Sequence, residues 1–309
     1  MKKSNPLFSI IIPTYNREKF IFETVQSVLN QTHIDFELII VDNKSTDKTK
    51  EIVLSFSDSR INFIQNDKNY ERCYSRNVGI KISKGEYILF LDSDDLLENN
   101  HLLNWFNTLQ DLNFTKGFFI CRKKILNLDK ILNDLNFKLF NSKRELLINL
   151  IQVPVLPGQV CVSKSILSEF QFNKEYLIFE DTALWLQIGN KFSPYFFDFS
   201  TFVYRVHDMN SVNWKYSNYG VLKLKSLKLF CKYNSEIVSQ LGRKIVNQEF
   251  SVTLFNVCKY HIYNKNRGNA IYYCFLSLFY KFSFHQLKHR FLVFFRLILI
   301  RTITEYSYK

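Results

Sequence analysis

Three aspartates stand close together in the segment Tyr87–Asp95, whose sequence is YILFLDSDD. The apolar residues at its start indicate a buried strand, and Asp92, Asp94 and Asp95 follow that strand at once. Carboxylates this close repel one another unless a cation or basic side chains neutralise them, and hard divalent metals prefer oxygen ligands. The segment therefore predicts either a metal site at the end of a strand or an Asp/Ser-rich turn that caps the next helix.

The first hundred residues must position these acids, and they alternate between apolar runs and amphipathic segments. Strands are predicted at Phe8–Ile12, Phe36–Val41, Arg60–Gln65 and Tyr87–Leu91. Helices are predicted at Arg17–Asn30 and Glu71–Ser83, and a third between them starts after Ser45 or Thr46, either of which could be its N-cap. Asn16 is a candidate N-cap of the first helix. This alternation predicts a parallel, doubly wound sheet with right-handed crossovers.

Polar residues follow the predicted strands, and ligands bind at the carboxyl ends of strands in such a sheet. The residues brought to this rim are Thr14, Tyr15, Asp42, Asp92 and Asp94. The sequence contains neither G-x-G-x-x-G nor G-x-x-x-x-G-K-[ST], which disfavours dinucleotide enzymes and P-loop NTPases. A nucleotide held here would need an aromatic and a carboxylate for its base and ribose, which Tyr15 and Asp42 can supply. Its phosphates would need a metal and basic side chains, such as Arg72 and Arg76.

Four motifs stand in a recognisable order and spacing. They are IIPTYNR (Ile11–Arg17), VDNKSTD (Val41–Asp47), SRNVGI (Ser75–Ile80) and FLDSDD (Phe90–Asp95). In these motifs the chain resembles the family 2 glycosyltransferases. The resemblance implies the GT-A fold, an α/β fold with a Rossmann-like, mostly parallel sheet flanked by helices, here followed by a mostly helical basic C-terminal region.

The resemblance also implies a nucleotide-sugar donor, usually a UDP-sugar. Thr14, Tyr15 and Asp42 would hold the base, Asp92 would lie near the ribose, and Asp94 would bind Mn²⁺ or Mg²⁺ bridging the diphosphate. On the same ground, further motif residues are assigned to the donor site: Pro13, Asn16, Arg17, Arg76 and Ser93.

Within these four motifs the chain departs from the family's pattern at three positions, and outside them Gln187 stands where many relatives have Arg. Family members often have a second acidic residue and a glycine where this chain has Asn43 and Lys44, and often an alanine in place of Ser75. The resemblance therefore predicts the fold more strongly than it predicts which nucleotide or sugar is bound.

The segment Phe179–Gly189, FEDTALWLQIG, predicts a helix whose first turn carries Glu180 and Asp181. Taken alone, this pattern is simply a helix start that the helix dipole favours. The resemblance implies instead that Asp181 is the general base of an inverting transfer, which needs a carboxylate to remove the proton of the acceptor hydroxyl. Glu180 would orient the acceptor or its neighbour.

A strand is predicted over Val203–Val212, VYRVHDMNSV. A lone histidine is more often structural than a ligand. The resemblance implies that His207 can complete the metal site, since imidazole together with carboxylate and phosphate oxygens suits Mn²⁺. Arg205 is a further candidate for contact with the diphosphate.

The net charge of +13 is concentrated at one end of the chain. Residues 216–309 contain 15 Lys or Arg against 3 Glu, a net charge of +12. This asymmetry predicts two parts, a near-neutral one that carries the chemistry and a basic one that faces an anionic surface or partner. The resemblance implies that the first part, 1–215, is a glycosyltransferase domain, with the nucleotide-sugar bound by about 1–100 and the acceptor by about 101–215. The second part, 216–309, is predicted to be a helical basic region.

The C-terminal region has no uncharged apolar stretch near the roughly 20 residues of a membrane span. On a helix, its basic side chains Lys281, His285, Lys288 and Arg296 fall within one arc, as on an interfacial helix at anionic lipid. A helical cap or dimer interface is the alternative, and no nucleic-acid-binding motif is present. Six scattered cysteines without a C-x-x-C pair and a short N-terminal apolar run indicate a cytoplasmic protein. The basic C-terminal region predicts that this protein is peripheral at the inner face of the membrane.

Together these features predict an inverting, metal-dependent hexosyl- or N-acetylhexosaminyltransferase. Its acceptor would be a glycan or lipid-linked saccharide in surface polysaccharide or glycoconjugate synthesis. Two alternatives stay open. A nucleotidyltransferase would be expected to open with a Gly-rich loop where this chain has PTYNR, and a non-catalytic nucleotide- or glycan-binding subunit would lack turnover.

Overall fold

The computed structural model describes residues 5–127, 130–133, 142–209, 218–279 and 284–299. The chain divides into two compact units. The first unit comprises Met1–Leu146, Val153–Lys174 and Glu180–His207. The second comprises Leu147–Gln152, Glu175–Phe179 and Asp208–Lys309, so two short segments from the middle of the chain belong with the C-terminal helices.

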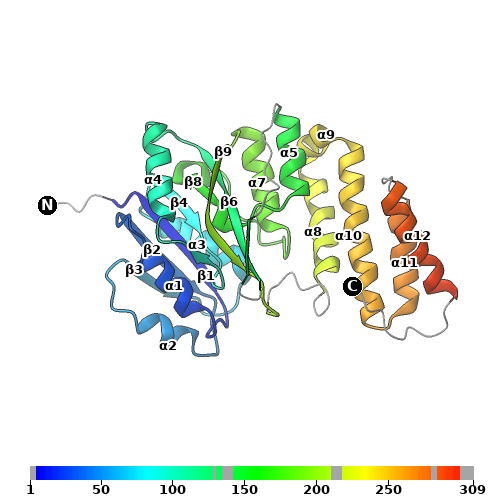
Figure 1. The fold of residues 1–309 in the computed structure, drawn as a ribbon, viewed down its shortest axis with the longest axis horizontal. Helices are drawn as coiled ribbons and strands as arrows, with labels where there is room; N and C mark the ends of the chain where they lie inside the picture. The colour runs from blue at the N-terminus through cyan, green and yellow to red at the C-terminus, as the bar shows by residue number, and fades with distance from the viewer. Residues whose placement is uncertain (1–4, 128–129, 134–141, 210–217, 280–283, 300–309) are drawn as a thin grey trace. The chain divides into compact units, whose positions relative to one another are not determined.

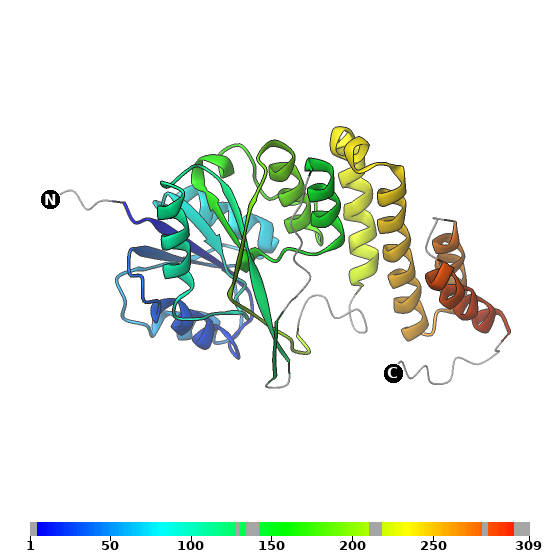
Figure 2. The same cartoon turned by 45° about the horizontal axis from the view of Figure 1, so that its top comes forward.

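Over the described residues of the first unit, nine strands form one mixed sheet (Figure 1). The strands are β1 Phe8–Thr14, β2 Phe36–Asp42, β3 Ile61–Gln65, β4 Tyr87–Phe90, β5 Leu96–Leu97, β6 Phe118–Asn127, β7 Lys130–Asn133, β8 Val160–Ser163 and β9 Tyr195–Arg205. Their order is β3-β2-β1-β4-β8-β6-β9-β5, with β7 paired to β6. The first four strands are parallel, β8 is antiparallel to both β4 and β6, and the long strands β6 and β9 run parallel side by side (Figure 2).

Helices cover both faces of this sheet. They are α1 Ile21–Leu29, α2 Thr49–Leu54, α3 Glu71–Ile82, α4 His101–Asp111, α6 Lys164–Leu167 and α7 Glu180–Lys191. A further helix, α5 Lys143–Gln152, is divided between the units, because its residues from Leu147 onward belong to the second unit. Alternate residues of β1 explain the two layers, because Ile10 and Ile12 join a core with α1 and α4, whereas Ile11 faces α3. A Cβ on Gly79 of α3 would meet Ile11 Cγ2 at 2.4 Å, so only glycine lets this helix approach so closely.

The predicted strands and helices of the first hundred residues agree with the structure to within a few residues. The strand predicted over Val203–Val212 is wrong in its bounds, since β9 starts at Tyr195 and ends at Arg205. Alternating side chains begin eight residues earlier than the prediction, and β9 pairs with β6 along most of its length. His207 therefore lies beyond the strand, where its side chain is not constrained to a sheet face.

The second unit is helical over the residues that the structure describes. Its helices are α8 Tyr219–Tyr233, α9 Ser235–Leu241, α10 Arg243–Tyr263, α11 Arg267–Leu278 and α12 Phe284–Leu299. Two small apolar cores hold α10 against α8 and against α11 and α12. Within the described residues, none of the helices has the length and apolar character needed to cross a bilayer. The predicted basic arc falls on side chains outside the described part of the chain.

Candidate active site

The carboxyl ends of the central strands meet at one rim. Thr14 of β1 pairs with Asp42 of β2, which pairs in turn with Gln65 of β3. On the other side of β1, Leu91 donates its backbone N–H to the Ile11 carbonyl at 3.0 Å, and the acidic segment begins with the next residue. Parallel pairing thus brings three loops that are distant in sequence to the same edge of the sheet.

Hydrogen bonds from backbone N–H groups to side chains join the first loop to the second loop and to the start of α2. The Asn16 N–H donates to Ser45 Oγ at 2.9 Å, the Thr46 N–H donates to Asn16 Oδ1 at 2.8 Å, and the Arg17 N–H donates to Thr49 Oγ1 at 2.7 Å. Asn16 has a left-handed φ of 51° and does not cap α1, so that prediction is wrong; α1 starts at Ile21. These bonds hold Tyr15, 41% exposed, at the rim.

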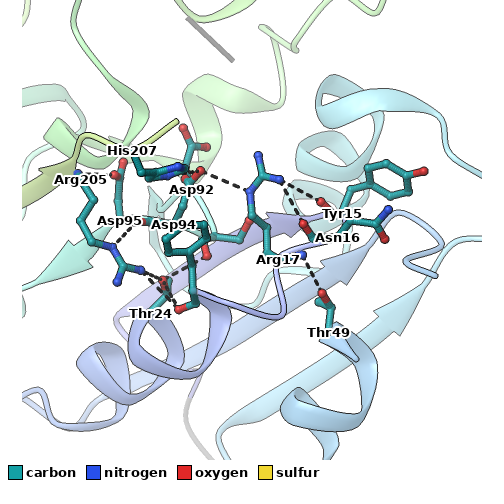
Figure 3. A network of polar contacts seen from close by, with 12 residues as sticks. Tyr15, Asn16, Arg17, Thr24, Thr49, Asp92, Asp94, Asp95, Arg205 and His207 are labelled. Carbon is teal, nitrogen blue, oxygen red and sulfur yellow. Dashed lines mark hydrogen bonds and ion pairs between the residues drawn. The ribbon is translucent and has the colours of Figure 1, made fainter. Parts of the chain in front are cut away.

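Asp94 lies between a guanidinium and an imidazole (Figure 3). Its Oδ2 is 3.3 Å from Arg17 Nε and 3.2 Å from His207 Nε2. The ring of His207 stacks on Phe20 at 4.2 Å between centroids, which fixes its plane. Burial raises the pKa of Asp94, but the His207 hydrogen bond and the Arg17 charge outweigh it, so that the pKa is lowered and the carboxylate stays ionised.

The donor set of Asp94 and His207 fits a divalent metal ion such as Mn²⁺. One carboxylate oxygen and one imidazole nitrogen already converge within 3.2 Å. No cluster of three or more His, Cys, Asp or Glu suited to a metal occurs in the described ranges. The chain would therefore supply two ligands, and oxygens of a bound diphosphate would have to supply others.

Arg205 approaches the same segment from the side opposite Arg17 (Figure 3). Its guanidinium donates to the Asp94 carbonyl, to Thr24 Oγ1 at 3.1 Å and to the Phe20 carbonyl at 3.3 Å. The Arg205 N–H also donates to Asp95 Oδ1 at 3.0 Å. Arg205 is buried and fixes the acidic loop to α1, and its predicted contact with the diphosphate stays a prediction.

Asp95 is the most deeply buried aspartate of the acidic segment. Burial, followed by the charges of Asp94 and Asp92, raises its pKa well above the usual range. A carboxyl group of this kind is a structural partner for the end of β9.

A buried arginine joins the donor side of the rim to the first turn of α7. Arg76 donates from Nη2 to Asp92 Oδ1 at 2.7 Å and from Nη1 to Glu180 Oε1 at 3.1 Å. Its guanidinium also lies over the Phe172 ring, 5.0 Å from the centroid. Only 1% of the Arg76 side chain is exposed, so in this structure it orients two acids and is not placed to reach a ligand directly.

Asp181 follows Glu180 at the start of α7 and is half-buried. Burial, and then the negative charge of Glu180, raise the pKa of Asp181 to about 7, although Arg76 opposes this. One oxygen, Oδ1, accepts the Thr182 N–H at 2.6 Å. A carboxylate with a pKa near neutrality can both take up and release a proton under physiological conditions.

Asp42 occupies the predicted strand end, but its carboxylate is fully buried. Its oxygens accept from Ser45 N–H at 3.1 Å, Ser45 Oγ at 2.5 Å and Gln65 Nε2 at 2.7 Å. Thr14 and Ser93 are also buried, and Ser93 accepts from Thr24 Oγ1 at 3.2 Å through its carbonyl. The predicted roles of these residues and of Pro13 in binding a donor stay predictions.

Sequence reasoning missed a polar network beneath Tyr70. Asn66 Nδ2 donates to Asn43 Oδ1 at 3.0 Å and to Ser75 Oγ at 3.1 Å. Asn43 and Ser75 are two of the three motif positions that depart from the family's pattern, and the structure joins them through the Asn66 amide. The sequence signal for this network was that both positions carry a polar residue that is unusual in the family, which suggests that the two side chains share a hydrogen-bond partner.

Comparison with known proteins agrees with the family that the four motifs predicted. The model of "Glycosyl transferase family 2" matches residues 9–166, just over half of the chain. The Escherichia coli protein WfaP, a UDP-Glc:alpha-D-GlcNAc-diphosphoundecaprenol beta-1,3-glucosyltransferase, is 34% identical over 187 residues, which are 60% of this chain and 71% of WfaP. An uncharacterized glycosyltransferase of Rickettsia bellii is 33% identical over 185 residues, 59% of this chain. The match spans only 26% of that longer relative.

Two solved structures share the fold. Residues 1–349 of S. aureus TarS in complex with UDP-GlcNAc superpose with a TM-score of 0.64 at 19% identity, covering 88% of this chain and 80% of that one. The mannosyltransferase PcManGT from Pyrobaculum calidifontis, in complex with GDP-Man and Mn²⁺, gives a TM-score of 0.56 at 15% identity over 96% and 81%. These likenesses confirm the predicted α/β fold with a helical C-terminal region. With the family model over half its length and WfaP at 34% identity, this chain belongs, as its four motifs predicted, to glycosyl transferase family 2.

Proposed function

We propose that the chain is an inverting glycosyltransferase that moves a hexose or N-acetylhexosamine from a nucleotide-sugar, with a UDP-sugar as first candidate, to a saccharide acceptor. The observation that carries the proposal is the hydrogen-bonded path along the rim. Arg76 joins Asp92 to Glu180 through two ion pairs. In the sequence, Asp92 is close to Asp94, the proposed metal ligand, and Glu180 precedes Asp181, the proposed general base.

In this proposal Asp181 accepts the proton of the acceptor hydroxyl. The hydroxyl oxygen then forms a bond to the anomeric carbon while the bond from that carbon to the diphosphate oxygen breaks, so the configuration inverts. A pKa of about 7 for Asp181 suits a general base near neutral pH. Arg76 and Glu180 fix the position of the base relative to Asp92.

On the donor side, Tyr15 offers an exposed ring on which the nucleobase of the donor can stack. Arg17 places a positive charge beside Asp94. A divalent ion held by Asp94 and His207 would neutralise negative charge on the departing diphosphate. The predicted domain assignment is part of the proposal, with residues 1–215 carrying the chemistry and 216–309 an accessory region.

The relatives support a class of donor and acceptor. WfaP takes UDP-Glc and a diphosphoundecaprenol-linked GlcNAc by its name, TarS was solved with UDP-GlcNAc, and PcManGT with GDP-Man. We extend this to a lipid-linked saccharide acceptor in surface polysaccharide or glycoconjugate synthesis. The enzyme would then work peripherally at a membrane surface.

The test is a panel of nucleotide-sugars scored by Mn²⁺-dependent thermal stabilisation, followed by hydrolysis and transfer assays with each stabilising donor. A bound donor raises the melting temperature according to its affinity. Asp181→Asn should keep this stabilisation and lose turnover by at least about a hundredfold, the scale of general-base catalysis.

Other outcomes separate the alternatives. A binding-only subunit would show stabilisation without turnover in the wild type. A nucleotidyltransferase would release diphosphate from a nucleoside triphosphate. Either result would overturn the proposal.

A further inference from the structure

Two neighbouring helices of the second unit expose large apolar side chains. On α11 and α12 these are Tyr272, Phe275, Phe279, Phe291, Leu292, Phe295 and Ile298, each between 44% and 67% exposed. Single exposed apolar residues are ordinary on a protein surface, but a contiguous group indicates a binding surface.

The exposed residues lie opposite the face that each helix buries. On α11 the buried residues are Ala270, Cys274 and Ser277, and at 100° per residue the exposed aromatics fall about 180° away. On α12 the buried side chains are Arg290, Val293 and Leu297, and the exposed ones again lie on the far side. Helices that are apolar on both faces are normally covered on both.

Ring contacts join exposed side chains of the two helices through Phe294, which is half-buried and also packs against the apolar core of α10, α11 and α12. Centroid distances are 4.7 Å from Phe279 to Phe275, 5.8 Å from Phe275 to Phe294, 6.0 Å from Phe294 to Phe295 and 6.4 Å from Phe295 to Phe291. We call these five residues the aromatic band. It runs from α11 to α12 without a break.

The fold holds the aromatic band in place. Arg267 at the start of α11 donates to the Leu297 and Ile298 carbonyls of α12, both at 2.7 Å. From α12, Arg290 donates to the Ser251 carbonyl of α10 at 3.2 Å. Because the middle and the C-terminal end of α12 are bonded to its neighbours, the exposed rings are a built feature of the helical unit and not the result of a loosely attached helix.

The positive charge of this part of the chain favours an anionic lipid surface over a second copy of the chain as the partner. Residues 250–304 contain eight Lys or Arg and no Asp or Glu. A second copy of the chain would bring the same positive charge to the interface, which like-charge repulsion opposes. An anionic lipid surface offers an apolar layer for the rings and phosphates for the basic residues other than Arg290, which is buried.

We propose that the aromatic band binds the surface of an anionic lipid bilayer, with its phenylalanine rings in the interfacial layer. This goes beyond the proposed sugar transfer and does not depend on it. A bilayer surface is also where a lipid-linked acceptor would lie.

The test is sedimentation of the full chain with vesicles of phosphatidylcholine alone or mixed equally with phosphatidylglycerol. We expect binding to the mixed vesicles that weakens at high salt, and little binding to phosphatidylcholine alone. Phe291→Ser/Phe295→Ser should lower the partition coefficient by about tenfold or more. The matched control is Tyr233→Ser/Tyr263→Ser, which removes two exposed aromatics of the same unit outside the band and should bind like the wild type.

Unchanged binding of Phe291→Ser/Phe295→Ser, or equal binding to both kinds of vesicle, would overturn the proposal. So would a wild-type dimer in light scattering that the same variant dissociates, because a second copy would then cover the band. If the double variant fails to fold, Phe279→Ser at the end of α11 replaces it. Asp181→Asn should bind vesicles normally, so a failure of the catalytic proposal is read separately.

Discussion

At the scale of single residues, the carboxyl groups of the site differ widely in pKa because their surroundings differ. Asp94 is kept ionised by His207 and Arg17, whereas Asp95, one residue on, is pushed toward its neutral form by burial and by its acidic neighbours. Asp181 lies between these extremes with a pKa of about 7. Separation of pKa values within one acidic cluster lets neighbouring carboxyls take different roles.

Asp181 predicts the pH dependence of transfer. A general base acts in its ionised form, so kcat/KM should rise with pH, reach half its plateau near pH 7 and fall about tenfold per unit below that. Glu180→Gln removes the negative neighbour that raises the Asp181 pKa, so its midpoint should shift to lower pH. Glu169→Gln, at a surface ion pair, should leave the midpoint unchanged; a midpoint that does not respond to Glu180→Gln would contradict this role.

Asp94 and His207 predict a metal requirement. Chelation with EDTA should abolish transfer, and added Mn²⁺ should restore it. Asp94→Asn and His207→Ala should each weaken Mn²⁺-dependent donor binding by about tenfold or more, measured by calorimetry. His261→Ala, in the second unit, is the control. Asp94→Asn and His207→Ala variants that bind the donor with the same affinity and the same Mn²⁺ dependence as the wild type would rule out this use of the pair.

Lys44 predicts a stability gain. It is exposed and has a φ of 69°, at a position where glycine is common in the family. A left-handed conformation costs an L-residue about 1–2 kcal/mol, and glycine loses about 0.4–1 kcal/mol more unfolded-state entropy. Lys44→Gly should therefore raise the free energy of unfolding by about 0.5–1 kcal/mol in urea titrations. Lys48→Gly, at a φ of −77°, should lower it.

At the scale of elements, the end of β9 locks the acidic loop to α1. Arg205 makes this lock from the last position of the strand, through carbonyl and hydroxyl acceptors on two other segments. The loop that carries Asp92 and Asp94 therefore depends on a strand more than a hundred residues away. Its position is decided by packing between elements and not by its own turn chemistry.

Arg205→Gln should destabilise the first unit. The buried Asp94 carbonyl and its neighbours would lose their donor, at a cost of about 1–3 kcal/mol for each unsatisfied group. We expect the free energy of unfolding to fall by about 2–4 kcal/mol in urea. Arg60→Gln, which removes a partly exposed ion pair to Asp58, should change it by less than about 1 kcal/mol. Equal effects of the two variants would argue against the lock.

At the scale of the whole molecule, chemistry and charge are divided between two units. The residues of the candidate site all belong to the first unit, and the aromatic band belongs to the second. Each unit has its own apolar core. Such a division allows the two units to differ in stability.

Calorimetry should therefore resolve two unfolding transitions. A donor with Mn²⁺ should raise only the transition of the first unit, by about 2.7 kcal/mol at a hundredfold excess over Kd. Arg205→Gln should lower that same transition. Equal shifts of both transitions would mean instead that the units unfold as one.

The sequence by itself determined which residues stand at the rim. Apolar runs end where strands leave the core, so Thr14, Asp42 and Asp92 could be placed at strand ends from periodicity, and four motifs identified the family. The helix carrying Asp181 was likewise visible in the pattern around it. These are local properties, because each depends on residues within one or two turns or strands.

Only the tertiary structure decided what those residues contact. It buried Asp42 against Gln65, turned Arg76 toward Glu180, which is 104 residues away, and aimed Arg205 at Thr24 across 181 residues. Periodicity reports whether a side chain is covered, but not which distant group covers it. Partners that far apart are chosen by sheet order and helix packing, which no local pattern contains.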